Sequence, residues 1–553
     1  MSNDKGEIDM APTESKTTGT IGNLPHGSRE TPLIFVLSTG ADRSEKARGH
    51  KSDMDVSGES HSFIVPKKPA NKGRVPRPAE LAEGRELTKE NTEQLLLDRT
   101  QSRKSDGRPF EARSRGLLGV REAARRGRKQ KFTSLLHHVT AGLLRASFFE
   151  LKKQAAPGID GETWRDYAVC LERRIEDLHE RIHRGTYRAK PSKRSYIPKA
   201  EGGMRPLGIA ALEDKIVQQA ARTVLECIYE QDFAGFSYGY RPGRSSHQAL
   251  DSLFVGISRR KVNWIIDADI RGFFDNISHE WLMKFAEHRI ADRRMLRLLK
   301  KWLRAGVSEN GEWSPTKVGT PQGAVISPLF ANVFLHYVLD LWIQDWRKRQ
   351  AKGEVIIVRY ADDFVIGFRE ESDARKCLAA LGERLVKFGL ALHPGKTRLI
   401  EFGRYAEERR AKRGDGLPET FDFLGFTHIS GKTLGGEFTI HRRTARKKFQ
   451  AKLAELKEML SRRRHEDLAK VGEWLQSVYR GWCQYYAVPG NSARLQQFRA
   501  AIQVMWLRNL QRRSQRGRRL TWVKFSKLCK CWLPTPKILH PYPSVRFACQ
   551  HPR

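Results

Sequence analysis

The chain has 553 residues, of which 101 are Lys or Arg and 63 are Asp or Glu, so its formal net charge is +38. This excess favours a polyanionic partner such as a nucleic acid. There is no signal peptide and no apolar run of about 18 residues, which argues against a membrane partner. Seven scattered cysteines suit a reducing compartment, so we expect a cytoplasmic protein.

The N-terminal part of the chain has two sections of different composition. Residues 1–90 are rich in Ser, Gly, Thr, Pro and mixed charge and are predicted to be disordered. Residues 91–155 are predicted to be a helical extension, and the apolar repeat within residues 132–153 predicts a helix there.

A run of β-branched residues at 262–270 predicts a strand that ends in Asp267 and Asp269. We expect the strand to carry one acid on each face, with Asp269 facing a second acidic group further along the chain. Asp267 and Asp275 are more simply interpreted as capping residues of the following helix, whose predicted N-cap is Ser278.

The second acidic group lies between two apolar runs, at residues 355–358 and 364–368, which predict a β-hairpin. Its tip is Tyr360-Ala361-Asp362-Asp363. Adjacent carboxylates raise each other's pKa unless a cation neutralises them, and Mg²⁺ prefers such oxygen ligands. The hairpin is therefore a candidate metal site with Asp269 as third carboxylate, although paired acids also occur in solvated turns.

The C-terminal part is predicted to be helical and basic. Helices are expected over residues 444–463, 474–486 and 493–507. No acidic residue follows Glu473, so this tail is expected to track phosphates and to bind less tightly as salt rises. Interleaved aromatic residues are either base-stacking platforms or, where their spacing is helical, core.

Several sequence blocks occur in the order found in one known family. They are residues 157–161, 196–199, 205–209, 212–218, 237–244, the block at Asp269, the Pro-Gln-Gly loop at 321–323, Tyr360 to Asp363, 393–397 and 421–425. From about residue 85 onward, the chain resembles bacterial group II intron reverse transcriptases and maturases of the lineage without an endonuclease domain.

The resemblance implies an α+β right-hand polymerase. Fingers and palm, with a short antiparallel sheet, would occupy residues 156–430. An α-helical thumb, or maturase domain, would occupy 431–510, and a basic DNA-binding segment 511–553.

The resemblance also implies roles for individual residues. Asp269, Asp362 and Asp363 match catalytic metal ligands for two Mg²⁺ ions, and Lys396 matches a lysine that protonates pyrophosphate. The dNTP contacts would be Lys199, Arg205, Gln322 and Phe274, the last excluding a 2′-hydroxyl. In this basic chain the lysines and Arg205 would otherwise be interpreted as solvated surface. The implied nucleic-acid contacts are Arg480, Tyr485, Tyr486 and Arg494 for RNA, and Arg512, Arg513, Arg518 and Arg519 for DNA.

The expected function is RNA-directed DNA synthesis combined with binding of the host intron RNA to promote splicing and mobility. The partners would be intron RNA, an RNA template with a DNA primer, and target DNA in the bacterial nucleoid; dimerisation stays open. Two alternatives are a polymerase-inactive maturase and a bacterial reverse transcriptase outside introns, of the retron or phage-defence type. The intact acidic residues favour the first function.

Overall fold

The structure is a computed structural model that describes residues 109–198, 203–316 and 318–550. The chain divides into two units, Met1–Ala79 and Glu80–Arg553, and every described residue belongs to the second. The segment 1–90, predicted to be disordered, and Lys199, predicted to contact dNTP, lie outside the described residues.

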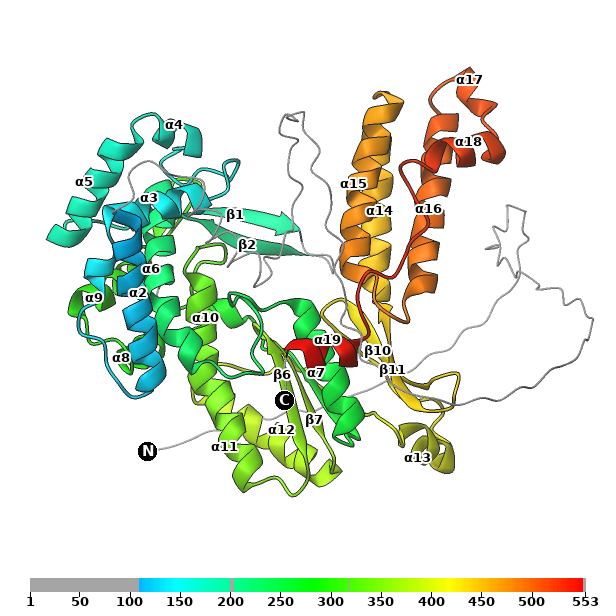
Figure 1. Ribbon diagram of the computed structural model, residues 1–553, viewed down its shortest axis with the longest axis horizontal. Coiled ribbons are helices and arrows are strands. Elements are labelled where there is room, and N and C mark those ends of the chain that lie inside the picture. The colour runs from blue at the N-terminus through cyan, green and yellow to red at the C-terminus, as the bar shows by residue number, and fades with distance from the viewer. Residues whose placement is uncertain (1–108, 199–202, 317, 551–553) are drawn as a thin grey trace, which may run out of the picture. The chain divides into compact units, whose positions relative to one another are not determined.

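The described part begins with a group of helices (Figure 1). They are α2 (Pro109–Arg126), the 3₁₀ turn η1 (Leu136–His138), α3 (Ala141–Glu150), α4 (Trp164–Ala168), α5 (Leu171–Arg184) and α6 (Leu212–Asp232). Of these, α2 and α3 pack against the long helix α6.

The prediction of one helix over residues 132–153 is wrong, because this segment forms two separate elements, η1 and α3. The Asp292 carboxylate accepts hydrogen bonds from the backbone of Leu135 and Leu136, at 2.7 and 2.9 Å. Thr140 then caps α3 by accepting from the Leu143 N–H. These polar groups compete with a continuous helix and divide the apolar repeat into two segments.

Three small sheets follow. The first has the order β2-β1-β4-β5, with β1 (Ser192–Pro198), β2 (Met204–Ile209), β4 (Val307–Glu309) and β5 (Glu312–Ser314). The central sheet has the order β6-β7-β3-β8, with β3 (Trp264–Ala268), β6 (Val355–Tyr360), β7 (Asp363–Phe368) and β8 (Arg398–Glu401). The third has the order β11-β10-β9, with β9 (Phe421–Phe423), β10 (Phe426–Lys432) and β11 (Phe438–Thr444).

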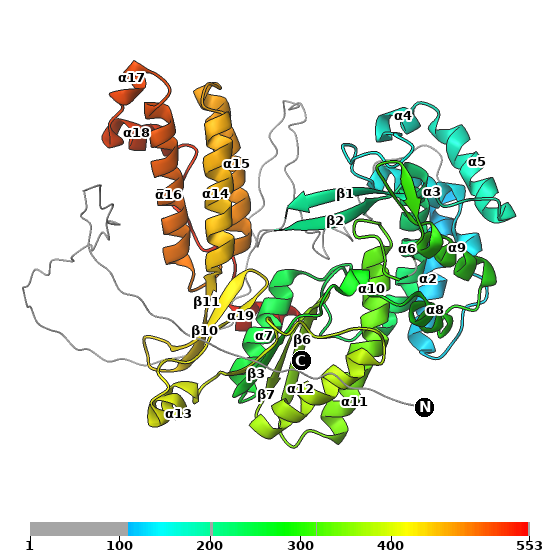
Figure 2. The ribbon, with the colours of Figure 1, turned by 180° about the vertical axis from the view of Figure 1, so that it is seen from behind.

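Both faces of the central sheet are covered, which explains its continuous apolar runs. Consecutive β3 residues Ile265 and Ile266 belong to two different hydrophobic clusters. The helix α7 contacts β6 and belongs with the Ile265 cluster, while α12 contacts β3 and β7 and belongs with the Ile266 cluster. Figure 2 shows these elements from behind.

The helices of this region, α7 and α12 included, have the following bounds. They are α7 (Ser246–Arg259), η2 (Phe273–Asp275), α8 (His279–Glu287), α9 (Arg293–Arg304), α10 (Ser327–Leu335), η3 (His336–Asp340, a π-helical turn), α11 (Leu341–Arg349), α12 (Glu371–Val386) and α13 (Ala406–Arg413).

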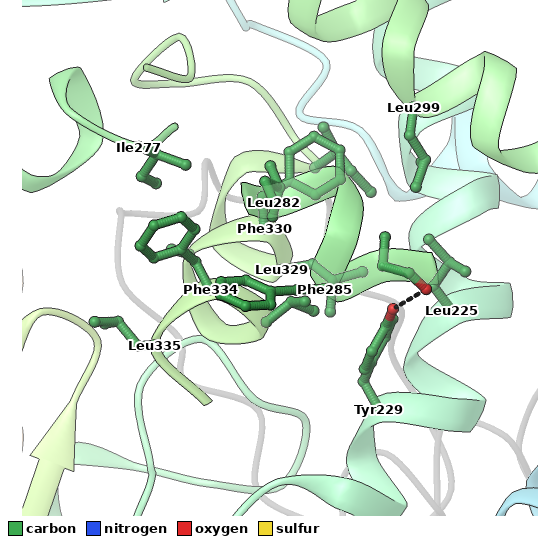
Figure 3. Packing of buried hydrophobic residues seen from close by; sticks show 14 of the residues in the cluster. Leu225, Tyr229, Ile277, Leu282, Phe285, Leu299, Leu329, Phe330, Phe334 and Leu335 are labelled. Atoms are coloured by element: carbon green, nitrogen blue, oxygen red, sulfur yellow. Dashed lines mark hydrogen bonds between the residues drawn. The ribbon is translucent and has the colours of Figure 1, made fainter. Parts of the chain in front are cut away.

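Aromatic and aliphatic side chains from α6, α8 and α10 interdigitate in the larger cluster (Figure 3). Phe285 meets Phe334 edge to face with ring centroids 5.5 Å apart. The buried Tyr229 hydroxyl donates to the Ala286 carbonyl at 3.5 Å, so its polar end is satisfied inside the core. This packing fixes α10, which begins at Ser327, shortly after the Pro-Gln-Gly loop at 321–323.

The three helices predicted for the C-terminal part are confirmed as α14 (Arg446–Arg462), α15 (Leu468–Tyr486) and α16 (Ser492–Gln511). Shorter helices follow: α17 (Gln515–Arg518), α18 (Trp522–Cys529) and α19 (Pro543–Gln550). Figure 1 shows α19 beside α7, far from it in sequence.

Residues 533–549, which we call the C-terminal strap, join the three-helix region to α7. The Leu539 N–H donates to the Ala487 carbonyl at 3.0 Å. In α19, Arg546 forms an ion pair with Asp251 of α7, which is fully buried and also accepts from Arg442 of β11 at 3.1 Å. The strap therefore runs over the surface but is anchored to α7 through the buried carboxylate of Asp251.

The predicted mixture of helices and small antiparallel sheets is confirmed. The assignment of these parts to fingers, palm and thumb stays a prediction, as do the domain boundaries. Among the described residues, no helix has the length and apolar character needed to cross a membrane.

Candidate active site

The central sheet brings the predicted acids together. The hairpin of β6 and β7 is confirmed, with Tyr360 opposite Asp363 at its end. The neighbouring strand β3 pairs antiparallel with β7, with Ala268 opposite Phe364. Asp269 directly follows Ala268 and Asp363 directly precedes Phe364, and the charge of Asp269 acts on both Asp362 and Asp363, so the three acids lie close together at one edge of the sheet.

The charges of these acids act on one another. The pKa of Asp363 is raised to about 7 by desolvation and by the charges of Asp362, Asp269 and Asp267. Its side chain still reaches solvent at the hairpin tip. The pKa of Asp362 is also raised, mainly by burial, with a contribution from Asp269, and is lowered in part by Arg205. The cluster therefore resists holding its full negative charge without a cation.

Asp267 corrects two sequence predictions. It lies two residues before Asp269, and residues two apart along a strand point to the same face, so the acids are not on opposite faces. Its charge accordingly acts on Asp363. It caps no helix either, because it forms an ion pair with Arg398 of β8 at 3.2 Å. The helix α8 is capped as predicted by Ser278, whose hydroxyl accepts from the Trp281 N–H, and not by Asp275.

Lys396 reaches the acids from the turn before β8. Its Nζ lies 3.1 Å from Asp269 Oδ2. The turn is attached to the same residue, because the His393 N–H donates to the Asp269 carbonyl at 2.8 Å. The Lys396 N–H in turn donates to the His393 carbonyl at 3.1 Å, which closes the turn. Sequence reasoning predicted a role for Lys396 but not this ion pair.

The loop that carries Gln322 is held against the residues after β3. The Thr320 N–H donates to the Phe274 carbonyl at 2.9 Å, and a Cβ on Gly319 would lie 2.9 Å from that oxygen. The Gly208 N–H of β2 donates to the Gln322 carbonyl at 2.7 Å. Phe274 and Gln322 are half-buried. The loop thus links β2, which bears the exposed Arg205, to the edge with the acids.

Sequence reasoning missed two residues at this edge. Tyr240 has a left-handed backbone, with φ of 59°, and its side chain is 44% exposed. Its pKa is raised by burial and by the charge of Asp362, and lowered in part by Arg205, so it lies within the field of both residues. Arg359, next to the acidic tip, is fully buried. A charged residue inside an apolar strand is a sequence signal, because a buried charge requires partners.

One of the predicted RNA contacts, Tyr486, is buried, and its neighbour Tyr485 is half-buried. Tyr486 is buried, with its ring 4.2 Å from that of Trp482, and so offers no free face to a base. The Tyr485 hydroxyl donates to the Leu424 carbonyl at 2.8 Å. The helical spacing indicated core for Tyr486, and the structure agrees, while Arg480 is exposed and Arg494 lies over the Phe449 ring.

The predicted DNA contacts lie between α16 and α18. Arg512, Arg518 and Arg519 are exposed, whereas Arg513 is half-buried and donates to the His465 carbonyl at 3.3 Å. The predicted DNA-binding segment 511–553 is not uniform, because its later part is the C-terminal strap. Arg546 is engaged there with Asp251, and its charge is unavailable to a phosphate.

The fit of the site to a divalent cation rests on charge. No three Asp, Glu, His or Cys side chains in the described part of the chain are arranged as a ready-made metal site. The pKa of Asp362 and of Asp363 is raised first by burial and then by the charges of neighbouring acids; a bound cation would offset both effects, and carboxylates are the ligands that Mg²⁺ prefers. Asp269, Asp362 and Asp363 therefore fit such an ion chemically.

Comparison with known proteins agrees with this site. Residues 197–428 match the family described as reverse transcriptase (RNA-dependent DNA polymerase). The chain is 37% identical over 238 residues to the protein YkfC of Escherichia coli K12, covering 38% of this chain and 62% of that one. It is 42% identical over 178 residues to the group II intron-encoded protein LtrA of Lactococcus lactis, covering 31% and 29%.

A third similar protein is an uncharacterized 91 kDa protein in the cob intron of Schizosaccharomyces pombe, 33% identical over 241 residues, covering 42% of this chain and 29% of that one. The chain spans less than two thirds of the length of each of these relatives. Residues 197–428 are thus a reverse transcriptase domain by family match, and the predicted resemblance of the chain to group II intron-encoded proteins is confirmed.

Proposed function

We propose that the chain is an RNA-directed DNA polymerase that also binds its host group II intron RNA to promote splicing and mobility. The observation that carries the polymerase activity is the meeting of Asp269, Asp362 and Asp363 at one sheet edge, inside the region that matches the reverse transcriptase family. A maturase that had lost polymerisation would have no need to maintain three mutually repelling carboxylates there.

Asp269 and Asp362 would hold two Mg²⁺ ions, with Asp363 supporting them. When bound, these ions supply the charge neutralisation that phosphoryl transfer needs at the attacking and leaving oxygens. The reaction joins the primer 3′-hydroxyl oxygen to the α-phosphorus of a dNTP paired with the RNA template, and pyrophosphate leaves.

The remaining side chains bind and orient the nucleotide. Arg205 is exposed on β2, on the side linked to the acids through the Gln322 loop, and would steady the triphosphate together with Lys199. Phe274 would lie under the incoming sugar and exclude a 2′-hydroxyl. Lys396, positioned by the turn on Asp269, would give a proton to the departing pyrophosphate.

The partners follow from charge and from the names of the relatives. The net charge of +38 supports binding to intron RNA, to the template with its DNA primer and to target DNA. The exposed arginines Arg480, Arg512, Arg518 and Arg519 are the candidate phosphate contacts. The relative from L. lactis is named as a group II intron-encoded protein, which supports an intron RNA as the bound RNA.

The test is Mg²⁺-dependent primer extension on an RNA template, with Asp362→Asn as the matched variant. We expect cDNA from the wild type and none from the variant, with RNA binding retained by both. If the wild-type protein bound RNA but made no cDNA, the polymerase assignment would be wrong and a maturase without polymerisation would remain. Full activity in Asp362→Asn would overturn the assignment of the site.

A further inference from the structure

The residue directly before the acidic tip is a buried arginine with four hydrogen bonds. Arg359 and Asp340 are both fully buried, and Arg359 Nε and Nη2 donate to the two oxygens of Asp340 at 2.7 and 2.6 Å. Arg359 Nη1 donates to Asn332 Oδ1 at 3.1 Å and to the Ala361 carbonyl at 2.9 Å. The fourth bond therefore ends on the peptide that precedes Asp362.

Stability alone does not explain this group. A buried ion pair recovers little more than its own desolvation, and apolar residues of similar volume often serve as well. The neighbours of Arg359 in β6, Ile357 and Val358, are buried apolar residues. Arg359 thus differs from its neighbours in β6 because its side chain forms hydrogen bonds. One of these bonds ends on the hairpin tip, at the Ala361 carbonyl.

The tip has a backbone that needs support. Ala361 has φ of 59°, which is uncommon for a residue with a Cβ. This left-handed turn directs the chain from β6 into Asp362 and Asp363. Arg359 Nη1 donates a hydrogen bond to the Ala361 carbonyl. This bond stabilises the backbone conformation on which the direction of the two carboxylates depends.

A second segment is held against the tip by the same residues. The Tyr238 N–H donates to the Arg359 carbonyl at 2.8 Å, and Asn332 Nδ2 donates to the Gly239 carbonyl at 2.8 Å. A Cβ on Gly239 would lie 2.2 Å from the Ala361 nitrogen, so only glycine allows this approach. Asn332 therefore contacts both Arg359 and the segment that lies against the tip.

Asp340, the anionic partner, is at the end of the π-helical turn His336–Asp340 that follows α10. Such turns are rare and are often found at functional sites. Asn332 comes from α10 itself, one of the helices packed in the larger hydrophobic cluster (Figure 3). Both partners of Arg359 are thus fixed by a rigid element outside the sheet.

We propose that Arg359, Asp340 and Asn332 are positioning residues that fix the Asp362 carboxylate for metal binding by gripping the Ala361 peptide. This inference rests on the proposed polymerase function and deepens it. The three residues touch neither metal nor nucleotide, and they act through the backbone of the tip. Their loss therefore weakens metal binding and slows the chemical step, while nucleotide affinity changes little.

The experiment compares Arg359→Lys with Arg289→Lys in the full chain. Arg289 is a matched control: its Nε lies 2.9 Å from Asp232, the two side chains are 2% and 8% exposed, and its Nη1 donates to the carbonyls of Gly127 and Gln130. Mn²⁺ affinity is measured by electron paramagnetic resonance, with Asp362→Ala defining the signal of this site. Thermal unfolding, kcat and the KM for dNTP are measured alongside.

Both lysine variants should lose thermal stability. Arg359→Lys should also bind Mn²⁺ more weakly and lose about 10- to 100-fold in kcat with KM nearly unchanged, because small misplacements of reacting groups cost that much. Arg289→Lys should keep the wild-type Mn²⁺ affinity and kcat. Unchanged Mn²⁺ affinity in folded Arg359→Lys, or an equal loss in the control, would overturn the proposal.

If Arg359→Lys does not fold, the same measurements on Asn332→Ser test the proposal. This variant leaves the Arg359–Asp340 pair in place but removes the bonds of the Asn332 amide to Arg359 and to Gly239. The expected result is again weaker Mn²⁺ binding with KM preserved. Wild-type affinity in that variant would equally overturn the proposal. If the wild type bound Mn²⁺ at Asp362 but extended no primer, the proposed function would fail, while the Mn²⁺ measurements would still judge the positioning role.

Discussion

Lys396 Nζ and Asp269 Oδ2 form an ion pair across 3.1 Å, with side chains that are 50% and 28% exposed. Asp269 is one of the three carboxylates of the proposed metal site, and a lysine in contact with it lowers the negative charge that a cation meets. Lys396 therefore has two opposed effects on the reaction we propose: it competes with metal at Asp269, and it places a proton donor beside the acids.

Replacing Lys396 by Met should separate these two effects. The Mg²⁺ concentration for half-maximal extension should fall by up to about fivefold, because an ion pair this exposed is worth about 1 kcal/mol at most. The extension rate at saturating Mg²⁺ should fall as well. Mg²⁺ titrations of primer extension measure both quantities. A higher Mg²⁺ requirement in the variant would show that Lys396 does not compete with metal.

Metal binding should depend on pH near neutrality. The pKa of Asp363 is raised to about 7, so this carboxyl is partly protonated at pH 6 and ionised at pH 8. Protons then compete with Mg²⁺, and the half-saturating Mg²⁺ concentration should rise as the pH falls from 8 to 6. Titrations in a series of buffers check this. Asp363→Asn should flatten the dependence; if the slope were unchanged, another group would be responsible.

The same shift predicts the sign of a stability effect without added metal. A carboxyl whose pKa is higher in the folded than in the unfolded protein contributes stability at low pH, which is lost as the pH rises through about 7. Asp363→Asn should therefore raise Tm relative to the wild type at pH 8, and the gain should shrink below pH 5. Thermal unfolding in chelator measures it. A destabilised Asp363→Asn at pH 8 would contradict the repulsion among the acids.

Asp251 should be important for stability. It is fully buried and pairs with both Arg442 and Arg546. Replacing it by Ala would leave two arginines without their carboxylate, so the free energy of unfolding should fall by about 3–5 kcal/mol. Glu280→Ala is the control, since its pair with Lys284 is exposed and should contribute little to stability. Equal urea midpoints for the two variants would contradict a buried network.

Tyr240 should affect nucleotide binding. Its exposed ring lies within the electrostatic range of Asp362 and Arg205, the residues proposed to act at the metal and the triphosphate. Tyr240→Ala should therefore raise the KM for dNTP, while Tyr240→Phe should preserve most of the affinity that derives from the ring. Steady-state extension at varied dNTP measures this. A KM equal to that of the wild type in Tyr240→Ala would remove this residue from the site.

The sequence predicted the parts of the site that depend on local pattern. The hairpin and strand β3 follow from apolar and β-branched runs, and the cap at Ser278 from its residue type. The pairings of charged residues were not predictable in this way. Nothing local to Arg359 indicates Asp340 or Asn332 as its partners, and Asp267 was assigned to a cap although its partner Arg398 lies on another strand.

For Tyr486, local pattern and family resemblance led to different predictions. The helical spacing of Tyr486 with its apolar neighbours indicated core, but the family resemblance suggested RNA contact, and the packing against Trp482 decides for core. The strap was unpredictable for a different reason. Its basic composition resembles that of a phosphate-binding tail, and only the fold reveals that Arg546 faces a buried carboxylate.

The strap also sets the order in which this protein can mature during synthesis. Asp251 and Arg546 are separated by 295 positions. A ribosome must therefore translate the 295 residues from Asp251 to Arg546 before the buried carboxylate of α7 acquires its second arginine. Contacts between such distant residues form late and slowly, because a long loop must close first. Until then the nascent polypeptide holds an incompletely neutralised acid between α7 and β11, and this network is complete only once α19 has been made.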